Sequence, residues 1–277
     1  SLGVQTLKAA DEGIKSIQKL VNQARSVANQ ALQAKAEATT LSKTASAANL
    51  SAASGGARTF SIQVGTGAAR NIVLPAGADS NFATAADAAA AIAAAIDDEG
   101  IEGLTVSVSG GSLSFSLASG EDLTIAGAAA STLGIDTSGT QGQNGKTLEE
   151  ARSTFATDYN NLRTQIDQLA SDASFNGINL LNGDSLLVKF NEDGTSNLNI
   201  EGVRFDAGNL GITETSFGDI DADIALLDAA TKTLRTQAST FGANLSVVQN
   251  RQDFTKNMIN VLEGGAGALT LADTNVE

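Results

Sequence analysis

The longest regular pattern in the sequence is a heptad repeat between Ile220 and Leu262. Apolar or small side chains recur there at alternating steps of four and three residues, which is typical of helices that pack along their length. The positions are Ile220, Ile224, Leu227, Thr231, Leu234, Ala238, Phe241, Leu245, Val248, Gln252, Thr255, Ile259 and Leu262. At about 1.5 Å per residue, such a helix is roughly 65 Å long. Because a helix of that length cannot bury its stripe on a compact core, the pattern predicts packing against other long helices.

Two further segments carry the same spacing. Residues 2–46 are predicted to be helical, with Gly13 as a local weak point. The third helix is predicted to begin at Thr147, where Thr147 and Glu150 fit a capping box. The long helix described first is predicted to stop at Gly264-Gly265. The two stripes are Leu7, Ala10, Ile14, Ile17, Val21, Ala24, Ala28, Ala31, and Leu148, Ala151, Phe155, Tyr159, Leu162, Ile166, Leu169, Ala173.

Between the helix predicted at 2–46 and the helix predicted to begin at Thr147, the period of the hydrophobic positions changes to two, which is typical of strands. An Ala-rich helix at 83–96 interrupts five strand-like stretches. The strands are Phe60–Val64, Asn71–Leu74, Leu104–Val108, Leu113–Leu117 and Leu123–Ile125. A further alternating pair, Leu186–Phe190 and Leu198–Ile200, predicts a β-hairpin around Asn191–Gly194.

We therefore predict an α+β protein that is mainly α. Residues 1–46 and 147–277 form a discontinuous helical rod domain, made of heptad-packed long helices and a β-hairpin. Residues 47–146 form an inserted small α+β domain. The rod is expected to be elongated, with the inserted domain attached at one junction.

Composition limits the chemistry that this chain can carry. The formal net charge is −14, which argues against binding to nucleic acid or anionic membranes. There is no cysteine and no histidine, so thiolate catalysis and the commonest general base and metal ligand are absent. One Tyr and no Trp leave little for a stacking ligand site. We predict no enzyme activity, no catalytic residues, no cofactor and no metal.

Two short motifs have an ordinary structural interpretation. Gly65-Thr66-Gly67 begins like a dinucleotide fingerprint, but a strand rather than a helix follows, which favours a hairpin turn. Asp219, Asp221 and Asp223 begin like a calcium-binding loop, but Ile224 stands where that loop needs Gly. Carboxylates in the first turn of a long helix are better explained by its dipole.

The segment Ser174-Phe175-Asn176-Gly177-Ile178-Asn179-Leu180-Leu181-Asn182-Gly183 closely resembles the signature of bacterial flagellin. It follows a heptad helix and precedes a hairpin. Two flanking regions, near 10–28 and 245–273, resemble the N-terminal and C-terminal rod segments of that family. Residues 47–146 resemble, more loosely, a β-rich module of flagellins and hook-associated proteins.

The resemblance implies a structural subunit of an extracellular flagellar filament, exported without a cleavable signal peptide. Its rod packs laterally and axially against other copies, and the inserted domain faces outward. An export chaperone and hook-associated or cap proteins are the other implied partners. The motif residues assigned to assembly are Phe175, Asn176, Gly177, Asn182 and Gly183. The terminal core helices of the family are not found, so we expect a trimmed fragment that does not polymerise.

The family also implies an innate immune receptor as a partner. The equivalents of its receptor patch are Gln23, Arg25, Ser26, Val27 and Asp158. Recognised members have Arg and Glu where this chain has Gln23 and Ser26, so we expect weak activation.

Two other interpretations stay open. A hook–filament junction protein has a similar helical core. The inserted domain, residues 47–146, is alternatively a surface adhesin or glycan-binding module. The acidic charge and the small number of Tyr and Trp side chains in the chain count against this alternative. The family often places its variable domain after the hairpin, where this chain has only Gly211–Gly218, so the orientation of the inserted domain is left open.

Overall fold

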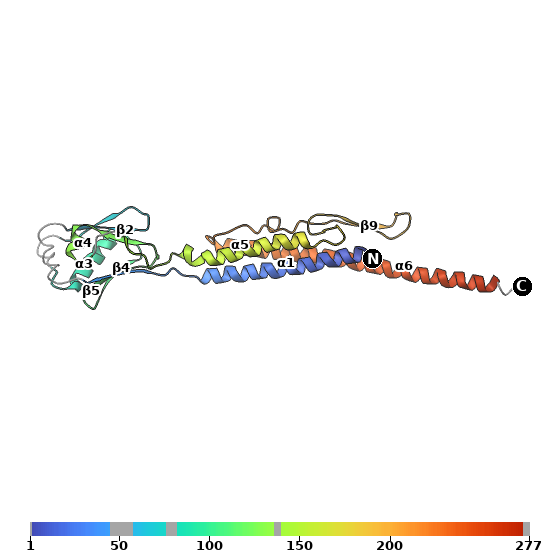
Figure 1. Cartoon of the computed structure of the whole chain (residues 1–277), viewed down its shortest axis with the longest axis horizontal. Helices are drawn as coiled ribbons and strands as arrows, with labels where there is room; N and C mark the ends of the chain where they lie inside the picture. Colours follow the sequence, from blue (N-terminus) through green and yellow to red (C-terminus); the bar gives the residue numbers. More distant parts are fainter. Residues whose placement is uncertain (1, 45–57, 76–81, 136–139, 274–277) are drawn as a thin grey trace. The chain divides into compact units, whose positions relative to one another are not determined.

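The computed structural model describes residues 2–44, 58–75, 82–135 and 140–273 (Figure 1). The chain divides into two compact units. Residues 1–32 and 155–277 form the first, here called the rod unit, and residues 33–154 form the second, here called the β unit. The fold is α+β and mainly α, as predicted.

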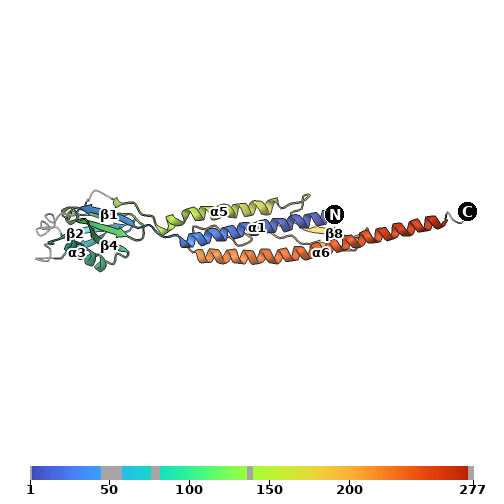
Figure 2. The same ribbon diagram turned by 90° about the horizontal axis from the view of Figure 1, so that it is seen from below.

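Three long helices build the rod unit. They are α1 (Leu2–Gln33), α5 (Leu148–Asp172) and α6 (Ile220–Asp273). Figures 1 and 2 show the three helices side by side in both views. A two-stranded antiparallel hairpin, β8 (Leu186–Lys189) with β9 (Asn197–Ile200), follows α5. The predicted hairpin and the three predicted helices are therefore all present.

The heptad stripes form the core of the rod unit. All eight predicted positions of the α1 stripe, from Leu7 to Ala31, are buried. On α6, burial recurs every seven residues, at Ile220, Leu227, Leu234, Phe241 and Val248. The interleaved positions, such as Ile224 and Leu245, are partly buried against the same core. Full burial of one Leu or Ile side chain contributes about 1.5–3 kcal/mol, so the shared stripe is the main source of cohesion.

The predicted end of the first helix is wrong. Helix α1 ends at Gln33, and Thr39–Thr44 form strand β1 instead of continuing the helix to residue 46. The three-and-four spacing stops after Ala31, and β-branched threonines follow, which favour an extended backbone. The Thr39 hydroxyl donates to the Glu121 carbonyl at 2.7 Å, which ties this segment to the β unit.

The predicted stop at Gly264-Gly265 is also wrong, because α6 continues to Asp273. A helical glycine costs about 1 kcal/mol relative to alanine, and the flanking Ala and Leu residues favour the helix. The seam also ceases to pack earlier than expected. From Asp253 to Ala266 the α6 side chains are exposed, including the seam positions Thr255, Ile259 and Leu262.

In its described residues, the β unit contains two antiparallel sheets, one longer helix and one short helix. One sheet has the order β1-β5-β4, and the other has the order β3-β2-β6-β7. Helix α3 (Ala85–Asp98) and the short α4 (Ala128–Thr132) complete its core. The strands are β1 (Thr39–Thr44), β2 (Thr59–Val64), β3 (Arg70–Val73), β4 (Leu104–Ser109), β5 (Ser112–Leu117), β6 (Leu123–Ala126) and β7 (Thr140–Gly142).

The five predicted strands and the predicted helix of this unit are confirmed, whereas β1, β7 and α4 were not predicted. The compact units divide at 32/33 and 154/155. The predicted domain limits, 1–46 with 147–277 and 47–146, stay a prediction.

Capping boxes begin two of the helices. The Thr147 hydroxyl accepts from the Glu150 backbone N–H at 3.2 Å, and Glu150 Oε2 accepts from the Thr147 N–H at 2.7 Å. This confirms the capping box that the sequence predicted. Thr84 and Asp87 make the same reciprocal pair at the start of α3.

Gly13 marks a close approach between α1 and the segment after α5. A Cβ atom built on Gly13 would lie 2.6 Å from Leu181 Cδ1 and 2.8 Å from Ala173 Cβ. Gly242, in α6, has nothing within 4 Å of the same position. The first glycine is therefore required by packing, and the second is not.

We expect Gly13→Ala to lower the free energy of unfolding by about 1–3 kcal/mol, since overpacking outweighs the gain in helix propensity. The matched control Gly242→Ala should raise it by about 0.5–1 kcal/mol. Urea unfolding followed by tyrosine fluorescence measures both, because the single tyrosine of the chain, Tyr159, lies in the rod unit. Stabilisation by both changes would contradict the close approach.

Candidate assembly surface

The segment between α5 and β8 begins with a tight turn. Phe175 and Ile178 exchange two backbone hydrogen bonds, of 2.9 and 3.1 Å. Asn176 and Gly177, between them, have φ angles of 51° and 80°. Positive φ at both central residues is the geometry of a type I′ turn, for which Asn-Gly is the preferred pair. The Asn-Gly pair therefore closes the segment onto itself directly after α5.

Asn179 holds the rest of this segment against the end of α5. Its side-chain N–H groups donate to the carbonyls of Ala170 and Ser171 at 2.8 and 2.9 Å. Its side-chain oxygen accepts from the Leu181 N–H at 2.9 Å. One buried amide therefore satisfies two carbonyls at a helix C-terminus, which would otherwise lack partners.

The segment is then fixed to the chain that follows β9. The backbone N–H groups of Val203 and Phe205 donate to the carbonyls of Leu180 and Leu181, at 2.7 and 3.0 Å. Leu180 and Leu181 are fully buried beneath this contact. The buried half of the motif is thus structural.

The five motif residues assigned to assembly all lie on the surface. Phe175 is 37% exposed. Asn176, Gly177, Asn182 and Gly183 are exposed as well. Their accessibility leaves them free to contact another molecule, and their role in assembly stays a prediction. Asn179, the residue that organises the motif, was not among those assigned.

The receptor-patch equivalents do not form one contact network in the described residues. Arg25 makes an ion pair with Asp228 of α6 at 2.5 Å. Gln23, Ser26 and the partly buried Val27 lie on α1, and Asp158 is exposed on α5. A role for these five residues in receptor binding stays a prediction.

The start of α6 explains the aspartates that resemble a calcium loop. Asp219 caps the helix by accepting from the Ala222 N–H at 3.1 Å. Asp223 is buried and accepts from the Thr215 hydroxyl at 2.7 Å. Burial raises the pKa of the Asp223 carboxyl above its usual value. In the described part of the chain, no cluster of acidic side chains has the arrangement of a metal site.

Tyr159 lies next to this helix start. Its ring meets the Phe217 ring edge-on, with centroids 5.3 Å apart. The hydroxyl is buried and has no hydrogen-bond partner among the described residues. Burial, with a smaller contribution from the nearby Asp223 carboxylate, raises the pKa of Tyr159 to about 12.

A groove of about 240 Å³ lies between the hairpin and α6. Its apolar floor is formed by Val188, Phe190 and Val248, and its rim carries three cationic side chains. The guanidinium of Arg251 lies 5.6 Å from the centroid of the Phe190 ring, within the range of a cation–π contact. The cations are Lys189, Arg251 and Lys256; we call this site the cationic groove.

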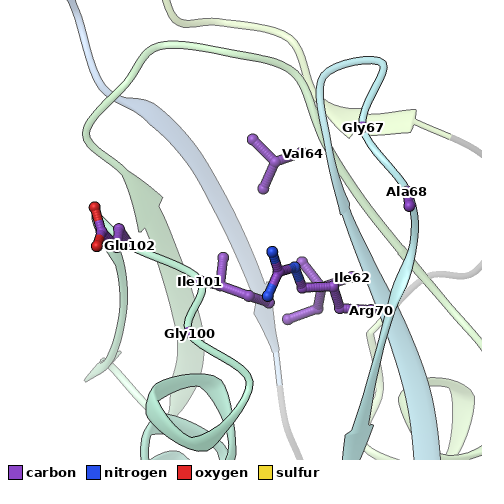
Figure 3. A pocket seen from close by; sticks show the side chains of 8 residues that line it. All are labelled: Ile62, Val64, Gly67, Ala68, Arg70, Gly100, Ile101 and Glu102. Atoms are coloured by element: carbon purple, nitrogen blue, oxygen red, sulfur yellow. The ribbon is translucent and has the colours of Figure 1, made fainter.

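The β unit has a cavity of about 260 Å³ between the β2–β3 hairpin and the turn after α3 (Figure 3). Ile62, Val64 and Ile101 form apolar walls. In Figure 3 the Arg70 guanidinium lies near Ile101, and the Glu102 carboxylate lies apart from it. Arg70 donates to the carbonyl of Glu99 at the C-terminus of α3, so it already serves that helix end.

The Gly65-Thr66-Gly67 motif forms the turn between β2 and β3, as predicted. Gly65 adopts a φ of 52° there. The motif therefore precedes a strand and places no helix N-terminus against a ligand.

None of the helices in the described part of the chain combines the length and the apolarity needed to cross a lipid bilayer.

Comparison with known proteins identifies relatives for part of this chain. Flagellin FljM of Caulobacter vibrioides is 29% identical over 122 residues, which cover 42% of this chain and 44% of the relative. Flagellins FljO and FljK of the same organism are each 27% identical over 122 residues, with the same coverage. Over part of its length, this chain is flagellin-like. The match spans less than half the length of these curated relatives.

No family model matches the chain. Among solved structures, the flagellar cap protein FliD of Escherichia coli aligns with 84% of this flagellin-like chain and 95% of its own D1-D2-D3 chain, at 15% identity. The TM-score of that alignment is 0.26, so it carries no argument about fold or function.

We expect Asn179→Ala to lower the free energy of unfolding of the rod unit by about 2–4 kcal/mol, because three hydrogen bonds of a buried amide are lost. The exposed Asn182→Ala is the matched control and should change it by less than about 0.5 kcal/mol. Urea unfolding followed by tyrosine fluorescence compares the two. Equal effects would show that the buried amide does not hold the motif together.

We expect Tyr159→Phe to raise the stability of the rod unit by about 1 kcal/mol, because it removes a buried hydroxyl without a partner. The raised pKa gives the pH dependence. The pKa of Tyr159 is about 12 in the folded chain and 10 in the unfolded chain. The free energy of unfolding is therefore constant with respect to this group below pH 10, and it falls as the pH rises through about 12.

An ultraviolet titration tests this directly, since the chain has one tyrosine and no tryptophan. Ionisation should have its midpoint near pH 12 in the folded protein and near pH 10 in urea. A midpoint near pH 10 in the folded protein would contradict the burial of this hydroxyl.

Proposed function

We propose that this chain is the rod-bearing part of a structural subunit of a bacterial flagellar filament. The observation that carries the proposal is the combination of the Asn179-centred segment with three helices that share one lengthwise core. The similarity to three flagellins over 122 residues supports it. The mechanism is packing: each rod is pre-formed, and copies stand side by side and end to end as the wall of a filament that serves motility.

The chemistry of the chain supports a structural role over an enzymatic one. It has no cysteine or histidine. In the described residues, Tyr159 and Asp223, whose pKa values are both raised by burial, lie in the rod core and line no cavity described above. The cavity of the β unit pairs apolar walls with an arginine that is already bonded to a helix end. It offers no acid–base pair at hydrogen-bond distance.

In this proposal the filament lies outside the cell, and copies of the same protein are the main partners. A hook–filament junction protein is the rival within the same class, because it would share the helical core. The two differ in copy number, with many subunits along a filament and a single ring at a junction. Contacts with an export chaperone and with hook-associated or cap proteins belong to the same proposal.

The test is a chimera that joins residues 1–277 to the terminal segments of flagellin FljM that flank its matched region. We expect electron microscopy to show filaments, because the added segments supply further packing surfaces between copies. A control chimera carrying Asn179→Ala should form fewer or less stable filaments. A folded chimera that stays monomeric at every concentration would refute the proposal, and short closed rings would favour the junction protein.

A further inference from the structure

We propose that the cationic groove binds the opposite end of the rod unit of a second copy, so that rod units pair head to tail. The receiving site is the groove lined by Lys189, Arg251 and Lys256. The site that enters it is the acidic end, defined here as Leu32, Glu214, Asp219 and Asp221. The inference deepens the proposed function, on which it rests, by naming a pair of surfaces that copies use.

The groove concentrates positive charge in a chain whose net charge is −14. Its cations converge from two elements, since Lys189 belongs to β8 and Arg251 and Lys256 belong to α6. All three side chains are exposed, and none makes an ion pair with a described residue. The acidic residues nearest in sequence to these cations are Glu192, Asp193 and Asp253. None of them forms a salt bridge with Lys189, Arg251 or Lys256. The site therefore has the charge and the apolar floor to accept a negatively charged, partly apolar surface.

The acidic end has the complementary charge. Between Arg204 and Lys232 the chain contains six acidic residues and no lysine or arginine. Asp228 pairs with Arg25, and Asp223 is buried. Glu214, Asp219 and Asp221 remain exposed around the start of α6.

An exposed apolar side chain lies at the same level of the bundle. Helix α1 runs antiparallel to α6, because Gly3 lies against Val188 of the groove while Arg25 pairs with Asp228. Leu32 is seven residues after Arg25, and Asp221 is seven residues before Asp228. Because the helices are antiparallel, Leu32 and Asp221 lie at the same level along the bundle axis. Leu32 is 47% exposed. It can therefore enter the apolar floor while the carboxylates meet the cationic rim.

One copy cannot satisfy its own groove. Asp221 and Arg251 lie thirty residues apart on one continuous helix, which is roughly 45 Å. Figure 1 shows the start of α6 and the hairpin far apart along the rod unit. Two different surfaces of the same chain that fit each other give a heterologous contact, which extends head to tail.

The contact is expected to be weak in isolation and sensitive to salt. Exposed ion pairs contribute little each, and they are screened over about 8 Å at physiological ionic strength. Repetition along an assembly lets such contacts add.

The experiment uses the 277-residue chain and charge-reversed variants in sedimentation equilibrium, at about 1 mM protein and at low and high salt. The groove variant is Lys189→Glu with Arg251→Glu and Lys256→Glu. The end variant is Glu214→Lys with Asp219→Asn and Asp221→Lys, where Asn keeps a capping side chain. We expect the parent chain to associate at low salt, and each variant to associate at least about tenfold more weakly.

Mixing the two variants is the decisive measurement. The intact acidic end of the groove variant fits the intact groove of the end variant, and the two reversed surfaces also carry opposite charges. The mixture should therefore associate more strongly than either variant alone. A charge-matched control reverses Lys19, Lys232 and Arg235, which are exposed along the middle of the rod unit. This control should associate like the parent chain. Circular dichroism verifies that each variant is folded.

Three outcomes would overturn the inference: a parent chain that stays monomeric at low salt, a mixture that does not pair, or a control that fails as the groove variant does. Failure here is distinguishable from failure of the proposed function. If the FljM chimera forms normal filaments with the groove variant, the filament proposal stands and this contact is wrong. If the chimera forms no filaments while the variants still pair as described, the contact stands and the filament proposal is wrong.

Discussion

The rod unit depends on the lengthwise burial of one narrow stripe on α1. That stripe contains Ala10, Ala24, Ala28 and Ala31 among its larger apolar residues, and all are buried. Small side chains let helices approach closely, but each removes little apolar surface from water. Cohesion must therefore be accumulated over many turns, and this explains why the helices are long. Gly13 is the extreme case, since the backbone of α1 meets Leu181 and Ala173 there with no space for a methyl group.

The segment between α5 and β8, residues 173–185, joins this bundle to the hairpin with very few residues. Asn179 serves the C-terminus of α5 and the backbone of the next turn at once. A side chain without both an amide N–H donor and a carbonyl acceptor would leave at least one buried polar group without a partner. The exposed residues of the same segment, Phe175 above all, are then carried on a rigid base. The buried part of this short stretch is thus structural, and its exposed part remains accessible to other molecules.

Much of this architecture was accessible from the sequence, because the period of the apolar positions differs clearly between helices and strands. The α1 stripe, the α6 stripe up to Val248 and the capping box at Thr147 were predicted correctly. Boundaries were predicted less well. Thr39–Thr44 form a strand only because β5 lies beside them, and a distant partner leaves no local signal. Gly264 and Gly265 were misjudged because their cost is small beside the many good helix formers around them.

The candidate surfaces were the least predictable part. The cationic groove joins residues about sixty positions apart, and the acidic end joins α1 to α6, so neither is visible as a motif. Asn179 stood inside the motif, but its spacing carries no sign that its amide is buried. Phe217 has a φ of 63°, and nothing in the local sequence indicates this conformation.

The last third of α6 has a consequence for how the helix opens. Up to Val248, its amides are shielded by packing as well as by their own hydrogen bonds. From Asp253 onward, the side chains up to Ala266 contact mainly solvent, and Phe254, Val261 and Leu262 are each more than half exposed. An isolated helical stretch of this length is marginal in water. Hydrogen exchange should therefore change abruptly within one unbroken helix, from slow, globally limited exchange to fast fraying, with the border near Gln252.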